Sequence, residues 1–171
     1  MDSVELSKTL RESARQNGLC NEWYNEWKDE ASEKSLAEKM YKGLDFCLKH
    51  HWPSNDFIKD NFSQGFLREV NVYVDDRHSV VNPNQSLVLG ESEITFRYNA
   101  AGHGEIHLRD NSSVKLSAKN RSFVIVHLYE NAHIEAVQSD MATLTLIKHS
   151  PDVTIVTDGN VKVKEEYDYL K

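Results

Sequence analysis

The sequence predicts an α+β protein in which an N-terminal helical head precedes a short β-solenoid, a parallel β-helix-like fold. Two observations lead to this prediction. Apolar side chains recur at helical spacing in the first third of the chain, and from Ser92 small, apolar and turn-forming residues recur about every ten positions. We therefore expect four consecutive segments: a helical head or cap (1–66), a strand and linker (67–91), β-solenoid repeats of about ten residues (92–164) and a charged tail (165–171).

The head is expected to contain four helices. The clearest begins at Ser35, which forms a capping-box pattern with Glu38. An apolar stripe follows at helical spacing: Leu36, Met40, Leu44, Cys47 and Leu48. The other three helices are expected to begin at polar residues that can cap a helix: Ser3, Asn21 and Ser54. These stripes predict a helical core rather than a ligand site.

Between the head and the repeats, the run "VNVYV" (70–74) alternates like a strand. The following run "DDRHSVVNPNQS" (75–86) is rich in turn-forming residues and predicts a loop.

The repeats are defined by columns of similar residues ten positions apart. Positions 92 to 142 are small: Ser, Gly, Ser, Ser, Ala and Ala. Two apolar columns follow. Positions 94 to 144 are Ile, Gly, Val, Val, Ile and Leu, and positions 96 to 146 are Phe, Ile, Leu, Val, Ala and Leu. Positions 100 to 150 are mostly turn formers: Ala, Asp, Asn, Glu, Asp and Ser. The phase then slips by one or two residues, at Val153/Ile155 and at Val161/Val163.

A ten-residue repeat holds one strand of about five residues and one tight corner. Within a strand, residues i and i+2 share a face, so Val114 and Leu116 are expected to point inward together. The turn-forming column is expected to bond its own backbone at the corners. Coils of two or of three strands would both stack the columns, and the sequence leaves that choice open. An antiparallel meander or small barrel, including a cupin-like one, is the competing interpretation, although only Asp158-Gly159 offers a favoured hairpin turn.

A solenoid ends in a row of unpaired backbone groups, so its terminal coils need caps. The head is expected to cap the first coil with its large aromatic side chains: Trp23, Trp27, Phe57 and Phe62. At the other end, the charged run "KVKEEYDYLK" (162–171) would oppose end-to-end growth.

The columns and the order of the two segments resemble uncharacterised β-solenoid proteins of bacterial and prophage-type genomes, in which a short helical head precedes the repeats. The resemblance covers the repeats and the general layout, and it implies no catalytic residues.

Composition excludes several classes of function. The net charge of −7, without a basic block, argues against nucleic acid as a partner. No apolar run reaches the roughly 18 residues that a membrane helix needs. The polar, acidic start "MDSVELSKTLRES" is typical of neither a secretory signal nor a transit peptide. Cys20 and Cys47 form no Cys-x-x-Cys motif and suit a reducing compartment, so we expect a cytoplasmic protein.

Four apolar residues of the repeats are expected to point outward: Phe123, Ile125, Val137 and Ile147. The first interpretation is that this face packs against the head, and the second is an interface with a protein partner or a second copy. The sequence therefore predicts a non-enzymatic structural or interaction module, which presents a rigid solenoid face and can self-associate.

The alternative function is a cupin-like or β-helical binder of small molecules or carbohydrates, or an enzyme, with a histidine-containing site. His107 and His127 are twenty residues apart and would stack one rung apart in a two-strand coil, with Glu105 or Glu135 nearby. They are the candidate metal ligands, but they lack the tight spacing of a dedicated site. We therefore predict no metal centre, no cofactor and no catalytic residue.

Overall fold

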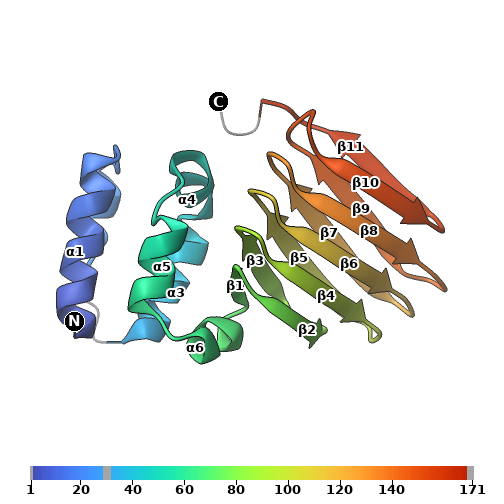
Figure 1. Ribbon diagram of the computed structural model, residues 1–171, viewed down its shortest axis with the longest axis horizontal. Coiled ribbons are helices and arrows are strands. Elements are labelled where there is room, and N and C mark those ends of the chain that lie inside the picture. The colour runs from blue at the N-terminus through green and yellow to red at the C-terminus, as the bar shows by residue number, and fades with distance from the viewer. Residues whose placement is uncertain (1, 29–31, 169–171) are drawn as a thin grey trace. The chain divides into compact units, whose positions relative to one another are not determined.

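The computed structural model describes residues 2–28 and 32–168, which form two compact units. The first unit contains the described residues up to Phe66, and the second contains those from Leu67 onward. Figure 1 shows helices in the first part of the chain and stacked strands in the second. The predicted fold class, a helical head followed by a β-solenoid, is confirmed.

Short helices make up the head, with bounds α1 Ser3–Gln16, α2 Asn21–Glu26, α3 Glu33–Lys42, α4 Leu44–His50 and α5 Asn55–Asn61. The helix expected to carry the stripe from Leu36 to Leu48 is divided into α3 and α4 at Gly43. A further helix, α6 (Gln64–Glu69), follows and was not expected. The apolar stripes form a buried core as predicted: Leu6, Leu10, Ala14, Trp27 and Leu36. Phe57 and Phe62 pack against this core, so they belong to the head itself. That the head caps the first coil stays a prediction.

Three of the expected helix caps are wrong by one or three residues. Asn21 is the first residue of α2, and Cys20 holds the cap position there without a side-chain hydrogen bond. The Asp2 carboxylate, not Ser3, accepts from the backbone N–H of Glu5 (2.8 Å) at the start of α1. Ser32 caps α3 by accepting from the N–H of Ser35 (3.2 Å), because Ser32 has the extended backbone that a cap needs. Ser54 caps α5 as predicted.

The solenoid is built from eleven described strands in two parallel sheets (Figure 1). The six-stranded sheet contains β1 Val72–Val74, β3 Gln85–Leu89, β5 Gly102–Leu108, β7 Ser122–Leu128, β9 Thr143–Lys148 and β11 Val161–Glu165, in that order. The five-stranded sheet contains β2 Arg77–Val81, β4 Glu93–Tyr98, β6 Ser113–Ala118, β8 His133–Gln138 and β10 Thr154–Asp158. Successive strands alternate between the sheets, so each coil has two strands.

The parallel pairing excludes the meander and the cupin-like barrel, because hairpin-connected neighbours would pair antiparallel. All the ladders between the described strands are parallel. In the central coils each residue pairs with the one twenty positions later, as Val124 does with Leu144.

Both predicted inward columns are buried in one continuous core. Val114 and Val124 are 0 % exposed, and Leu116 is 3 % exposed. A third inward column was not predicted, and it consists of Tyr98, Leu108, Ala118 and Leu128. Its residues range in size from alanine to tyrosine, so no common residue type reveals this column in the sequence.

The loop expected over residues 75–86 is wrong, because β2 and the start of β3 lie within it. His78 and Val80 point inward on β2 with partly buried side chains. The first coil is also shorter than the others, since Val72 pairs with Leu87, only fifteen residues later. The strands β1, β2 and β3, which lie within the expected strand and linker segment (67–91), therefore belong to the two sheets of the solenoid.

At the C-terminal end the phase slips as predicted, but by one residue and then by three rather than by one or two. Ile155 pairs with Ile134 at a separation of twenty-one residues, and Val161 pairs with Leu144 at seventeen. The charged run begins inside β11, where Val163 points toward the core side and is nevertheless 47 % exposed. Of the predicted tail 165–171, residues 169–171 lie outside the described residues.

The corners explain the small and the turn-forming columns. Ser92, Ser112 and Ser122 are buried, and the hydroxyl of Ser122 donates to the carbonyl of Lys119 (2.9 Å). Turn-forming residues adopt the left-handed backbone conformation: Asp110, Asn120, Glu130 and Asp140, with φ between 54° and 64°. The expected bond of such a side chain to its own corner is present at Ser150, whose hydroxyl accepts from the N–H of Asp152 (3.3 Å). Asp110 bonds to a neighbouring coil. Its carboxylate accepts from the N–H of Gly90 (2.7 Å), one coil earlier.

We expect Asp140→Gly to raise the free energy of unfolding by about 0.5–1 kcal/mol, because glycine adopts positive φ without the steric cost that a Cβ carries. Asp140 has φ 54°, and Gly90 already occupies an equivalent corner at φ 67°. Urea denaturation measures the change. Ser139→Gly is the matched control: Ser139 has no positive φ, so this change should destabilise by about 0.5–1 kcal/mol. Destabilisation by both changes would contradict the prediction.

Candidate functional site

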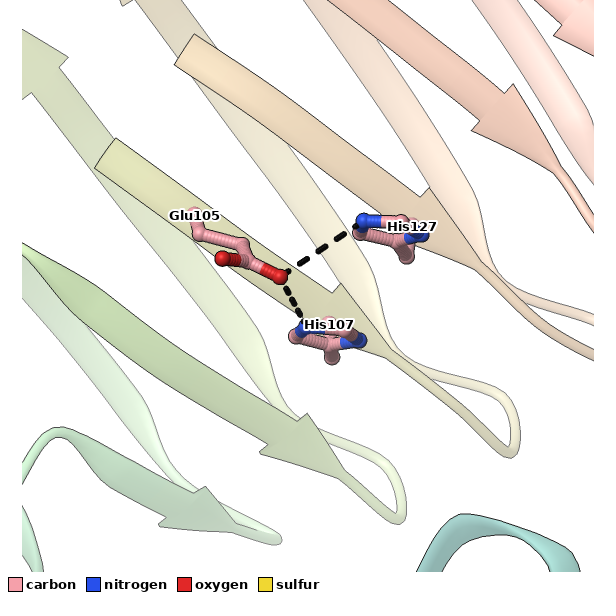
Figure 2. Close-up of side chains that lie close together, drawn as sticks. All are labelled: Glu105, His107 and His127. Atoms are coloured by element: carbon pink, nitrogen blue, oxygen red, sulfur yellow. Dashed lines mark hydrogen bonds and ion pairs between the residues drawn. The ribbon is translucent and has the colours of Figure 1, made fainter. Parts of the chain in front are cut away.

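A cluster of polar side chains lies on the outer face of the six-stranded sheet. His107 on β5 and His127 on β7 are directly paired between neighbouring coils, which confirms the predicted stacking one rung apart. Their rings are parallel within 2°, with centroids 4.5 Å apart. Glu105 precedes His107 by two residues on the same strand and shares its face. Figure 2 shows one oxygen of the Glu105 carboxylate facing both imidazoles.

One oxygen of Glu105 faces a nitrogen of each ring. Glu105 Oε1 lies 2.9 Å from His107 Nε2 and 3.7 Å from His127 Nε2. Because an ionised carboxylate only accepts, the shorter contact is a hydrogen bond donated by His107. The side chain of His107 is 3 % exposed and that of His127 is 13 %, whereas Glu105 is 38 % exposed. The cluster is therefore open to solvent mainly at the carboxylate.

The stack of imidazoles continues to His149, which follows β9. His127 Nδ1 lies 2.9 Å from His149 Nε2, and the two rings are parallel within 3°. His149 Nδ1 in turn lies 2.9 Å from the backbone carbonyl oxygen of Glu166. Tyr129 stacks on His149 with centroids 4.6 Å apart, and its hydroxyl is 3.3 Å from His107 Nδ1. A chain of polar contacts thus connects the last coil to Glu105.

Two groups of the cluster have shifted pKa values. The hydrogen bond from His107, helped by nearby imidazole charge and opposed by desolvation, lowers the pKa of Glu105. Burial lowers the pKa of His149, partly offset by its hydrogen bond to the Glu166 carbonyl. Glu105 is therefore held as a carboxylate and His149 is favoured as a neutral imidazole.

The ten-residue columns do not predict that His149 and Tyr129 join this cluster. His149 follows His127 by 22 residues instead of 20, so it contacts His127 diagonally across the ladder while Ile147 is the direct neighbour. The alternative acidic partner, Glu135, is on the five-stranded sheet, where it lies 3.7 Å from His133. Of the two carboxylates considered, only Glu105 joins His107 and His127.

The four predicted outward residues do not form one surface. Phe123, Ile125 and Ile147 lie on the outer face of the six-stranded sheet, whereas Val137 lies on the five-stranded sheet. Phe123 and Val137 are each 44 % exposed, Ile125 is partly buried and Ile147 is 9 % exposed. The prediction of a single flank is wrong for Val137, because odd and even repeats alternate between the sheets.

The fold and this cluster define the chain as a β-solenoid protein with a helical head and a histidine–carboxylate stack. No protein-family model, curated protein or solved structure matches the chain significantly. Across residues 2–28 and 32–168, the helices are too short or too polar to span a lipid bilayer.

Proposed function

We propose that this protein is a non-enzymatic interaction module that self-associates through the outer face of β7 and β9. The supporting observation is the lack of charge on that face. The outward side chains of these two strands are Phe123, Ile125, His127, Thr143, Thr145 and Ile147, none of which is acidic, lysine or arginine. Exposed Phe123 lies at one end of this surface, which we call the uncharged face, and stacks on His103.

The opposite sheet provides the contrast. Charged side chains point outward from every strand of the five-stranded sheet: Arg77, Glu93, Arg97, Lys115, Glu135 and Asp158. A mixed, solvated surface of this kind is typical of a face without a partner. The uncharged face differs from it although both sheets are built from repeats of the same kind.

A second copy of the chain is the occupant that the charge favours. Each copy carries a net charge of −7, so two copies repel each other at most surfaces. The side chains of the uncharged face carry no formal charge of their own, and the charges that flank it on the neighbouring strands include both Glu105 and Lys162. The stacked ladders supply a rigid, regular sheet surface, and two such sheets pack face to face about 10 Å apart. The cytoplasmic location and the resemblance to prophage-type solenoids remain predictions.

We expect the protein to form a defined oligomer in light scattering, and Ile125→Asp to convert it to monomers. The substitution places a carboxylate in an apolar contact, where its desolvation is costly. Circular dichroism should show an unchanged fold, since Ile125 points away from the core. Val137→Asp is the matched control on the opposite sheet and should leave the oligomer intact. A wild-type protein that is monomeric at high concentration would rule out self-association and direct the search to a foreign partner.

A further inference from the structure

We propose that Glu105, His107 and His127 form a binding site for one divalent transition-metal ion of the zinc class, with two nitrogen ligands and one oxygen ligand. The site shares His127 with the uncharged face, but bound zinc and oligomeric state are separate readouts. Two imidazoles with one carboxylate are a donor set that zinc takes in proteins, with a further position left for water. The close approach of all three groups comes from stacking of β5 on β7, which spacing along the chain does not reveal.

The distances suit an ion at the position where the three groups converge. Bonds of about 2.0–2.2 Å at tetrahedral angles place ligand atoms about 3.3 Å apart. Glu105 Oε1 is 2.9 Å from one imidazole nitrogen and 3.7 Å from the other, on either side of that value. The ligand atoms of the three residues all lie within 4.8 Å of one another. Modest side-chain rotations would therefore complete the coordination. In these rotations each of the two parallel imidazole rings turns toward the ion.

The hydrogen bonds of the stack prepare His127 to act as a ligand. The carbonyl oxygen of Glu166 only accepts, so His149 Nδ1 must carry the proton. In that tautomer His149 Nε2 is the acceptor of the 2.9 Å contact, and His127 Nδ1 is its donor. The neutral tautomer of His127 consequently has a lone pair on Nε2, the atom on the Glu105 side.

The two contacts of Glu105 agree with this assignment of protons. The 2.9 Å contact has a donor, His107 Nε2, whereas the 3.7 Å contact joins a carboxylate oxygen to a nitrogen lone pair. Two lone pairs repel, so that contact is longer. A metal ion supplies the positive charge that all three atoms would share. When it binds, the His107 proton moves from Nε2 to Nδ1, where the Tyr129 hydroxyl oxygen, 3.3 Å away, accepts it.

His149 is a positioning residue in this scheme, because it acts on the ion through His127. Groups that hold a metal-ligating histidine by its second nitrogen are worth about 10–100-fold in metal affinity. His149→Phe keeps a ring in the stack but removes the acceptor, and it should weaken binding by about this factor. His149→Gln offers an amide oxygen as acceptor and should retain more of the affinity.

The test is a titration of the full-length, metal-free protein with Zn²⁺ in competition with a chromophoric chelator. We expect one Zn²⁺ per chain in the wild type and loss of this stoichiometric binding in Glu105→Gln and in His127→Gln. Circular dichroism separates loss of the site from loss of the fold. His133→Gln is the matched control, because His133 also lies two residues from a glutamate and 3.7 Å from it, on the opposite sheet. That variant should bind like the wild type.

Three results would overturn the proposal: no stoichiometric binding in the wild type, wild-type affinity in folded Glu105→Gln or His127→Gln, or an equal loss in His133→Gln. Since the readout is bound zinc, a monomeric wild-type protein would leave this proposal standing and would refute only self-association.

Discussion

Replacing Gly104 by valine is expected to lower the free energy of unfolding by about 1–3 kcal/mol, the range for overpacked cores. The other members of its column are the β-branched or leucine residues Ile94, Val114, Val124, Ile134 and Leu144, so the sequence alone favours valine there. A Cβ at Gly104, however, would lie 2.3 Å from Cε1 of Tyr98. Tyr98 is 3 % exposed and its hydroxyl donates to the carbonyl of Pro83 (3.0 Å), so its ring has little room to withdraw.

A double substitution tests this explanation, because the next coil already contains the opposite combination. Tyr98 pairs with Ala118, and Gly104 pairs with Val124. One coil therefore combines the large side chain of tyrosine with a glycine, which has no side chain. The next coil combines alanine with valine. Tyr98→Ala alone leaves a cavity and should cost about 3–5 kcal/mol. Tyr98→Ala combined with Gly104→Val should cost less than the sum of the single changes, by about 1–3 kcal/mol. Additive costs in urea denaturation would show that the Tyr98–Gly104 contact is not the cause.

The regular coils could be predicted from the sequence because each inward column keeps its chemical character. Val114 and Leu116, for example, are buried beside Ile134 and Ala136 of the next coil, as their spacing indicates. Similar residues at a constant interval imply equal coils, and equal coils imply parallel stacking. The column analysis also placed His107 beside His127 for the same reason.

The irregular parts could not be predicted because they break the interval. The first coil advances by fifteen or sixteen residues, so β2 and β3 fell outside the columns. His149 contacts His127 diagonally, and no column contains both residues. The assignment of Val137 to the wrong face has another cause. A ten-residue period gives equivalent residues of successive repeats the same inward or outward direction. Only the three-dimensional coil shows that successive repeats belong to opposite sheets.

We expect Asp76→Asn to destabilise the solenoid by about 1.5–3 kcal/mol at neutral pH, the range for hydrogen bonds to charged groups. Arg68 donates two bonds to this carboxylate, from Nε to Oδ2 (2.9 Å) and from Nη2 to Oδ1 (2.7 Å). Asp76 is 4 % exposed, and its own N–H donates to the hydroxyl of Ser92 (3.1 Å). An asparagine keeps the shape but offers one acceptor oxygen and no charge, so the paired geometry is lost.

The same pair predicts how stability depends on pH. The hydrogen bond and charge of Arg68, opposed by desolvation, lower the pKa of Asp76. A lowered folded-state pKa means that the contribution is fully present above the unfolded value of about 3.9 and is lost as the pH falls below it toward the folded value. In urea denaturation from pH 7 to pH 2, the difference between wild type and Asp76→Asn should be constant near neutrality and shrink below about pH 4.

The neighbouring ion pair is the control for that measurement. Arg77 Nη2 lies 2.8 Å from Glu93 Oε1, but the two side chains are 79 % and 56 % exposed. Exposed pairs contribute about 0–1 kcal/mol, because water screens the charges and both side chains lose freedom. Glu93→Gln should therefore change stability little at any pH in this range. If the two substitutions have equal effects, or if the difference for Asp76→Asn is as large at pH 2 as at pH 7, burial of the Asp76 carboxylate beside Arg68 is not what stabilises the first coil.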